Sequence, residues 1–206
     1  MLSASGLFLA LEGGEGAGKS TQARLLQEWL TAAGHDVLLT REPGATDVGV
    51  EIRRIVLSPE TGELHPRTEA LLYAADKAEH VDAVVLPALA AGRVVITDRY
   101  VDSALAYQGG GRESVDPDLE RMLRWATGDL RPQLTVVLDL ESSAGLARFA
   151  ERDRIEAEGP AFHQRVRAHF LELAEADPEH YLVLDARDDV ETIAKAIRTR
   201  VEGLLP

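Results

Sequence analysis

Short, continuously apolar segments alternate along this chain with longer segments in which apolar residues recur every three to four positions. The first kind predicts β-strands, and it occurs at Leu7–Leu11, Val37–Thr40, Val94–Thr97, Leu134–Leu140 and Tyr181–Leu184. Because these runs are apolar on both faces rather than alternating, they indicate an α/β fold with a five-stranded parallel sheet and helices on both faces.

The second kind of segment predicts α-helices. They are expected at about Lys19–Ala33, Val48–Leu57, Arg67–Ala91, Asp116–Thr127, Ser142–Arg152, Ala161–Ala176 and Val190–Leu204. Gly34 ends the first helix, and the long third helix is expected to break near Pro87. Two polar stretches, Gln108–Asp116 and Glu151–Pro160, are expected to be mobile.

Composition narrows the possible partners. The 206 residues are 45% hydrophobic and 28% charged, which fits one globular domain spanning residues 1–206. The formal net charge of -13 argues against nucleic-acid and anionic-membrane partners, so an anionic ligand requires a local cluster of arginine and lysine.

The chain has no cysteine, which excludes disulfides and thiolate chemistry. Met1–Leu11 lacks the features of a signal peptide and no apolar run reaches the ~20 residues of a membrane span, so we expect a cytoplasmic protein.

A glycine-rich motif follows the first predicted strand and opens the first predicted helix. It reads Gly-x-x-x-x-Gly-Lys-Ser, the pattern of a nucleotide phosphate cradle. Glycines let the backbone curl so that its N–H groups face phosphate oxygens, Lys19 supplies a mobile charge, and Ser20 supplies a hydroxyl for Mg²⁺. A glycine-rich turn without a ligand would leave the lysine and the clustered glycines unexplained. The predicted ATP-binding residues are Gly13, Gly14, Glu15, Gly16, Ala17, Gly18, Lys19, Ser20 and Thr21.

Charged residues also follow two other predicted strands, at ends that would face the same crevice as the cradle. Asp98 could hold Mg²⁺ through water, and Arg99 could clamp a phosphoryl group. Arg41 and Arg53 could face the phosphate of an acceptor. A surface Asp–Arg pair is common at strand ends, and exposed arginines on a loop and a helix are an equally good interpretation of Arg41 and Arg53.

Two helical spacings carry weaker signals. Tyr73 and Lys77 share one helix face and could bind a nucleobase, although spacing alone favours a core tyrosine beside a solvated lysine. Arg148 and Arg152 are also four residues apart and could belong to a lid over a transferred phosphoryl group, or to a solvated face with Glu/Arg pairs. The six histidines show no metal-ligand spacing and are interpreted as structural or exposed.

Taken together, these segments resemble the bacterial thymidylate kinase family over nearly the whole chain. The matching segments are Glu-Gly-Gly-Glu-Gly-Ala-Gly-Lys-Ser-Thr, Arg-Glu-Pro-Gly, Pro-Arg-Thr-Glu-Ala-Leu-Leu-Tyr-Ala-Ala-Asp, Asp-Arg-Tyr-Val-Asp-Ser-Ala-Leu-Ala-Tyr-Gln-Gly, Asp-Arg-Ile-Glu and Leu-Asp-Ala. The resemblance implies a three-layer P-loop NTPase fold with a short lid at about residues 148–160. It also implies a homodimer packed through helices, with the long Arg67–Ala91 helix as one candidate for the interface.

The implied activity is transfer of the ATP γ-phosphoryl group to dTMP with Mg²⁺, which gives dTDP for dTTP synthesis. The resemblance assigns the acceptor 5′-phosphate to Arg41, Arg53 and Arg99, and the sugar 3′-hydroxyl to Glu15. Tyr107 would pack under the sugar and disfavour a 2′-hydroxyl.

The base would be held by residues of two segments. Tyr73 would stack on thymine and Gln108 would bind the base edge. Two positions depart from the family pattern, because Lys77 stands where arginine is usual and Ala104 where a small polar residue is usual. The full set of expected dTMP-binding residues is Glu15, Arg41, Glu42, Arg53, Tyr73, Lys77, Arg99, Ala104, Tyr107 and Gln108.

Metal binding and catalysis complete the assignment by resemblance. Ser20 and Asp98 would hold Mg²⁺, with Glu42 supporting it through water. Since Gly16 stands where some members of the family carry a cradle arginine, the lid is expected to supply the catalytic arginine. The expected catalytic residues are Lys19, Asp98, Arg99, Arg148, Arg152 and Arg154.

Three other functions compete with this hypothesis. A deoxynucleoside kinase would need only a hydroxyl acceptor, and the additional arginines at 41 and 53 favour a phosphate acceptor instead. A nucleotide-dependent switch would turn over slowly without a monophosphate, and the Asn-Lys-x-Asp motif of guanine-specific switches is absent. A catalytically silent scaffold is disfavoured because Lys19, Ser20, Asp98 and Arg99 are all present.

Overall fold

The computed structural model describes residues 6–112, 118–147 and 152–205. One parallel sheet with the strand order β2-β3-β1-β4-β5 forms its centre. The strands are β1 (Leu7–Gly13), β2 (Val37–Arg41), β3 (Val94–Asp98), β4 (Leu134–Asp139) and β5 (Tyr181–Asp185). All five predicted strands and their parallel arrangement are confirmed.

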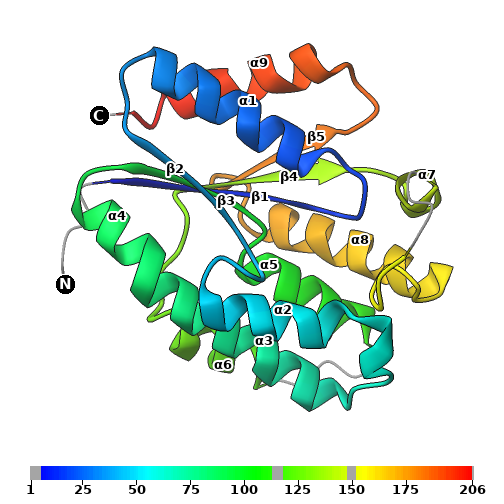
Figure 1. The fold of residues 1–206 in the computed structure, drawn as a ribbon. Coiled ribbons are helices and arrows are strands. Elements are labelled where there is room, and N and C mark those ends of the chain that lie inside the picture. The colour runs from blue at the N-terminus through cyan, green and yellow to red at the C-terminus, as the bar shows by residue number, and fades with distance from the viewer. Residues whose placement is uncertain (1–5, 113–117, 148–151, 206) are drawn as a thin grey trace.

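The sheet is the middle of three layers (Figure 1). Helices α1 (Lys19–Ala32) and α9 (Val190–Glu202) cover one face, where Leu9 of β1 packs into a core with Leu26 and Ile197. Phe8, the neighbour of Leu9, points to the opposite face. Successive residues of a strand point to opposite sides, so a strand buried on both faces is apolar at consecutive positions, as β1 is from Leu7 to Leu11.

The other face is covered by a larger set of helices (Figure 1). They include α2 (Asp47–Leu57), α3 (Pro66–His80), η2 (Val81–Val85), α4 (Leu86–Ala90), α5 (Val101–Ala104), η3 (Leu105–Gly111), α6 (Leu119–Ala126) and α8 (Pro160–Ala176). Two shorter elements, η1 (Pro59–Thr61) and α7 (Ser142–Leu146), lie in connections. The expected break near Pro87 takes the form of the π-helical segment η2, directly before α4.

The expectation of a mobile stretch from residue 108 is wrong for Gln108–Gly111, which lie in the π-helical segment η3. Residues 113–117 lie outside the described chain. Gly110 and Gly111 allow close packing against α8, because a Cβ at Gly111 would lie 2.7 Å from the ring of Phe162. A polar and glycine-rich composition therefore indicated close packing at this position rather than a solvated loop.

The region after β4 also differs from the expected helix. Helix α7 ends at Leu146, and Arg148 and the rest of residues 148–151 lie outside the described chain. Beyond them, the Asp153 carboxylate accepts hydrogen bonds from the backbone N–H groups of Ile155 and Glu156. The Ile155 side chain is buried, so the described part of the predicted lid forms a packed turn. No helix in the described ranges combines the length and the apolar character that crossing a membrane requires.

Candidate active site

The carboxyl ends of β1, β2 and β3 lie side by side and form one wall of a cleft. In the sheet register, Asp98 lies opposite Leu11 of β1 and opposite Arg41 of β2. The cleft is lined by Glu15, Gly16, Ala17, Gly18, Lys19, Ser20, Thr21, Arg41, Glu42, Arg53, Asp98, Arg99 and Glu156. The structure thus brings the glycine-rich motif together with the three arginines that were expected to face a phosphate.

The glycine-rich loop has the backbone conformation that its sequence demands. Gly13, Gly16 and Gly18 have φ values of 131°, 67° and 95°, which favour glycine. The Lys19 ammonium group donates hydrogen bonds to the carbonyl oxygens of Gly13 (2.9 Å) and Gly14 (2.7 Å). Burial, aided by the nearby Arg99 charge, lowers the pKa of Lys19 to about 8.

Helix α7 packs directly against this loop. A Cβ on Gly16 would lie 2.6 Å from the carbonyl oxygen of Gly145, and a Cβ on Gly145 would lie 2.1 Å from the carbonyl oxygen of Glu15. A larger residue at position 16 would therefore collide with the backbone of α7. This contact gives a physical reason for the absence of an arginine from the cradle of this chain.

Ser20 and Asp98 are the residues that could hold Mg²⁺. The Ser20 hydroxyl donates a hydrogen bond to the Asp98 carboxylate at the mouth of the cleft, so two oxygen ligands converge there. A hydroxyl, a carboxylate, phosphate oxygens and water are the hard oxygen ligands that Mg²⁺ prefers, and Mg²⁺ sites seldom consist of protein groups alone. The donor set therefore fits the metal. Among the described residues, no group of three or more acidic, histidine or cysteine side chains could hold a metal ion elsewhere.

A second pocket adjoins the cradle cleft. Its lining consists of Glu15, Glu42, Pro43, Arg53, Leu57, Tyr73, Lys77, Arg99, Ser103, Ala104, Tyr107, Gln108, Asp153, Ile155 and Glu156. The two cavities share Glu15, Glu42, Arg53, Arg99 and Glu156. All ten residues expected to bind dTMP line one of these two cavities, and among them Arg41 lines the cradle cleft but not the pocket.

Arg99 lies between the two cavities in a strained backbone conformation. Its φ is 71°, which costs a residue other than glycine about 1–2 kcal/mol. Its guanidinium group donates to the Gly13 carbonyl (3.1 Å), the Ser103 hydroxyl (3.0 Å) and the Glu15 carboxylate (2.6 Å). The Ser103 hydroxyl donates in turn to the buried Glu12 carboxylate at 2.6 Å. Three groups therefore hold this arginine directly, and Glu12 holds one of them, Ser103, in place.

Glu15 is the carboxylate at the centre of the site. It accepts hydrogen bonds from Arg99 and from the Tyr107 hydroxyl, the latter at 2.8 Å. Burial alone would raise the pKa of Glu15, but the charges of Arg99 and Lys19 outweigh it and hold the pKa at about 2. Glu15 is therefore ionised near neutral pH and can only accept hydrogen bonds.

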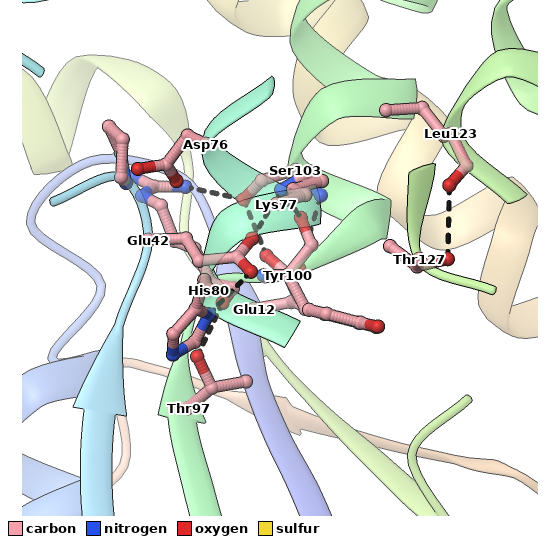
Figure 2. Close-up of polar contacts among 12 residues, drawn as sticks. Glu12, Glu42, Asp76, Lys77, His80, Thr97, Tyr100, Ser103, Leu123 and Thr127 are labelled. Carbon is pink, nitrogen blue, oxygen red and sulfur yellow. Dashed lines mark hydrogen bonds and ion pairs between the residues drawn. The ribbon is translucent and has the colours of Figure 1, made fainter. Parts of the chain in front are cut away.

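Lys77 is bound to protein groups at the floor of the second pocket. Its ammonium group donates to the Glu42 carboxylate and to the Tyr100 carbonyl oxygen (2.8 Å), and its side chain is 2% exposed. The other Glu42 oxygen lies 2.7 Å from His80 Nδ1 (Figure 2). Burial alone would raise the pKa of Glu42, but Lys77 and His80 outweigh this effect and lower the pKa below its ordinary value. The interpretation of Lys77 as a solvated lysine, which spacing alone favoured, is wrong. Both carboxylate oxygens of Glu42 have buried partners, and Glu42 also lines the cradle cleft, so its support of Mg²⁺ through water stays a prediction.

The remaining pocket residues come from α3, α5 and η3. Tyr73 is half-buried on α3, Ala104 is 2% exposed at the end of α5, and the Tyr107 ring packs between Phe162 and Phe170 in the hydrophobic core. The Gln108 amide nitrogen donates to the Glu69 carboxylate at 3.0 Å.

The two described lid arginines have different surroundings. The Arg154 guanidinium group binds the Glu69 carboxylate and donates to the Val56 carbonyl oxygen at 2.8 Å. Arg152 is exposed and forms no ion pair with another residue of the described chain. Neither arginine is part of the described lining of the cleft or the pocket, and Arg148 lies outside the described residues.

Several residues that organise the site were not predicted from the sequence. Glu12 and Glu69 are fully buried, and each binds groups that face the ligand cavities. A signal was present in both cases, because Glu12 interrupts an apolar strand, while Glu69 shares a helix face with Tyr73 and Lys77 at intervals of four residues.

Comparison with known proteins places this site in a family. The sequence profile of the thymidylate kinase family matches residues 11–197. The thymidylate kinase of Cutibacterium acnes is 55% identical over 201 residues, covering 97% of this chain and 98% of the relative. That of Desulforudis audaxviator is 48% identical over 204 residues, covering 98% and 92%. The crystal structure of thymidylate kinase from Ehrlichia chaffeensis has a TM-score of 0.78 and 27% identity, covering 96% of this chain and 98% of that one. A family profile and relatives that match almost the whole chain establish that it belongs to the thymidylate kinase family, with its P-loop NTPase fold.

Proposed function

We propose that this protein transfers the γ-phosphoryl group of ATP to the 5′-phosphate of dTMP. The observation that carries the proposal is the junction of two cavities: a phosphate cradle and a pocket suited to a nucleoside share Glu15, Arg53 and Arg99. A phosphate bound at this junction is within reach of both a donor on the cradle and a base in the pocket. The product, dTDP, is a precursor of dTTP for DNA replication.

In this proposal the chain positions two anions and neutralises their charge. The acceptor phosphate is already ionised near neutral pH, so no strong general base is required. Arg53 and Arg99 hold the acceptor phosphate together with Arg41, and Lys19 leaves the loop carbonyl groups to contact the outer phosphates of ATP. Catalysis then rests on alignment of the two phosphates and on exclusion of water by the lid segment.

Ser20 and Asp98 are proposed to hold Mg²⁺, Ser20 directly and Asp98 through water. When bound, the metal neutralises charge on the ATP phosphates. The base is proposed to stack on Tyr73 and to meet Gln108 at its edge, while Glu15 accepts a hydrogen bond from the sugar 3′-hydroxyl. Tyr107 packs below the sugar in this arrangement.

A homodimer packed through helices is also proposed. Leu71 on α3 and Trp125 on α6 are 58% and 83% exposed, which is unusual for large apolar side chains. Helices α3 and α6 pack against each other, and these two side chains are the part of the pair that is proposed to meet a second copy. The proposed substrates are soluble nucleotides, which favours the cytoplasm as the location.

The test is ADP formation from Mg-ATP with dTMP, dUMP, dCMP, UMP, AMP and GMP as acceptors and thymidine as a control. Strong stimulation by dTMP supports the proposal. Activity with thymidine and none with dTMP identifies a nucleoside kinase, and nucleotide binding without stimulation by any acceptor identifies a regulatory protein. Analytical ultracentrifugation of the wild-type chain and of Trp125→Ser tests the proposed dimer. If the dimer forms through this surface, the association constant of the variant is lower than that of the wild type.

A further inference from the structure

A fully buried carboxylate lies behind the base pocket. Glu69, on α3, is 0% exposed and accepts a hydrogen bond from the Gln108 amide nitrogen at 3.0 Å. Arg112 binds both Glu69 oxygens, at 3.0 and 2.9 Å, and Arg154 binds one of them. Arg112 also donates to Glu158 at 2.5 Å. This cluster therefore balances two positive and two negative charges between α3, η3 and the segment that follows the described gap at 148–151.

The chemistry of Glu69 fixes the orientation of the Gln108 amide. Arg112 and Arg154 donate to both Glu69 oxygens, so these oxygens act as acceptors and the group that Gln108 directs at them must be its NH₂. The amide carbonyl oxygen is the polar atom left for the pocket that Gln108 lines. Gln108 is 6% exposed, so the part of the residue that reaches the pocket can offer this oxygen to a ligand.

We propose that Glu69 is a positioning residue for base selection, which it achieves by presenting the Gln108 carbonyl oxygen to the base edge. This inference rests on the proposed function and adds a specificity rule to it. Thymine and uracil carry an N3–H donor between two carbonyl acceptors, whereas cytosine carries an acceptor at N3. An oriented carbonyl oxygen accepts from N3–H of the first two bases and meets the lone pair of cytosine N3 with repulsion. A freely rotating amide would satisfy both kinds of base.

The substitution Glu69→Gln tests this orientation and predicts the direction of the change. The carbonyl oxygen of the introduced side-chain amide is expected to face Arg112 and Arg154, which supply only donors. The NH₂ group of the same amide then faces Gln108, whose own amide must turn over and present its NH₂ to the pocket. The ratio of kcat/KM for dTMP to that for dCMP is expected to fall about tenfold or more, the effect of exchanging one good hydrogen bond for a mismatch. The ratio for dUMP against dCMP is expected to fall in parallel, because uracil has the same N3–H.

Arg112→Lys is the matched control, because it weakens the same buried cluster without removing the carboxylate that faces Gln108. It is expected to change kcat/KM for all acceptors by a similar factor and to leave the dTMP to dCMP ratio within about twofold of the wild type. If Glu69→Gln does not fold, Glu69→Asp carries the test, since it keeps the charge but shortens the reach to Gln108. That variant is also expected to lower the ratio.

The outcomes separate the inference from the function on which it rests. A wild-type protein without dTMP-stimulated activity contradicts the proposed function itself. A dTMP-specific wild type, combined with an unchanged ratio in Glu69→Gln or Glu69→Asp, refutes the positioning role alone. The same is true if Arg112→Lys lowers the ratio as strongly as Glu69→Gln, or if dUMP fails to follow dTMP, because the effect then comes from general loosening of the pocket.

Discussion

The buried cluster around Glu42 allows a quantitative test of the forces that hold the acceptor pocket together. The substitution Glu42→Gln keeps the size of the side chain and removes its charge. In the wild type, the Glu42 side chain is 1% exposed and binds Lys77 through one oxygen and His80 through the other. The variant leaves the Lys77 ammonium group buried with the Tyr100 carbonyl oxygen as its remaining strong acceptor (Figure 2).

The magnitude follows from this burial. Loss of one partner from a buried ion pair costs about 3–5 kcal/mol, because the other charge remains out of water. Since glutamine still offers one carbonyl oxygen, we expect a loss near the lower end, about 3 kcal/mol in the free energy of unfolding at pH 7.5. The pKa of Glu42 is lowered in the folded state, so its ionised form stabilises the fold above the ordinary value of 4.5, and this contribution disappears as the pH falls through the lowered value. The difference between wild type and variant should therefore shrink below about pH 4.5.

Urea unfolding, monitored by circular dichroism at pH 7.5 and below pH 4, measures the difference in the free energy of unfolding between the wild type and Glu42→Gln. Glu51→Gln is the matched control, because Glu51 pairs with Arg54 on the surface, where both side chains are 68% exposed. Its free energy of unfolding should stay within about 0.5 kcal/mol of the wild type. A Glu42→Gln variant as stable as this control at pH 7.5, or one whose deficit does not change with pH, would refute the reasoning.

The other predictions concern single groups of the site. Lys19→Ala should abolish phosphoryl transfer with an unchanged circular dichroism spectrum, and near-wild-type turnover would contradict the proposed mechanism. Arg99→Ala should weaken dTMP binding more than ATP binding in separate calorimetric titrations, whereas equal losses would argue against its role at the acceptor. Arg154→Ala should lower the free energy of unfolding by about 2 kcal/mol, because Glu69 loses a buried partner. Arg152→Ala should lower kcat and leave the free energy of unfolding unchanged. A variant Arg152→Ala with wild-type kcat and reduced stability would exclude Arg152 as the catalytic arginine of the lid. Burial raises the pKa of Glu12 to about 7, so the wild type should lose stability as the pH rises from about 4.5 to 7. Glu12→Gln should reduce that loss by up to about 3 kcal/mol in urea titrations at pH 5 and 8, and parallel curves for the two proteins would show that Glu12 does not titrate there.

The features that could be predicted from the sequence are those encoded locally. A strand such as β1 shows its burial in consecutive apolar residues, and the cradle is a contiguous motif whose glycines determine the backbone. The confirmed sheet and family follow from signals of this kind. Each pairs a residue type with a short spacing that the chain itself displays.

The partners of buried charges could not be predicted in this way. Lys77 and Glu42 are 35 residues apart, and Gln108 and Glu69 are 39 apart, so no periodicity connects them. Whether a lysine on a helix is solvated or buried depends on which carboxylate the folded sheet brings next to it. The π-helical segment η3 could not be predicted for a related reason. Gly110 and Gly111 are explained by the close approach of α8, which the sequence does not display.

Under the proposed function, a chain with a net charge of -13 must hold two anionic nucleotides, and the arrangement of Arg99 is suited to this task. A guanidinium group has five N–H donors, and three of them bind Gly13, Ser103 and Glu15. These bonds leave two further donors, so a phosphate can bind the guanidinium group without breaking the bonds that orient it. Glu12 supports this orientation from the far side through Ser103. Glu15 therefore need not oppose anion binding, because it holds the guanidinium group of Arg99 in place at the lining of the cleft.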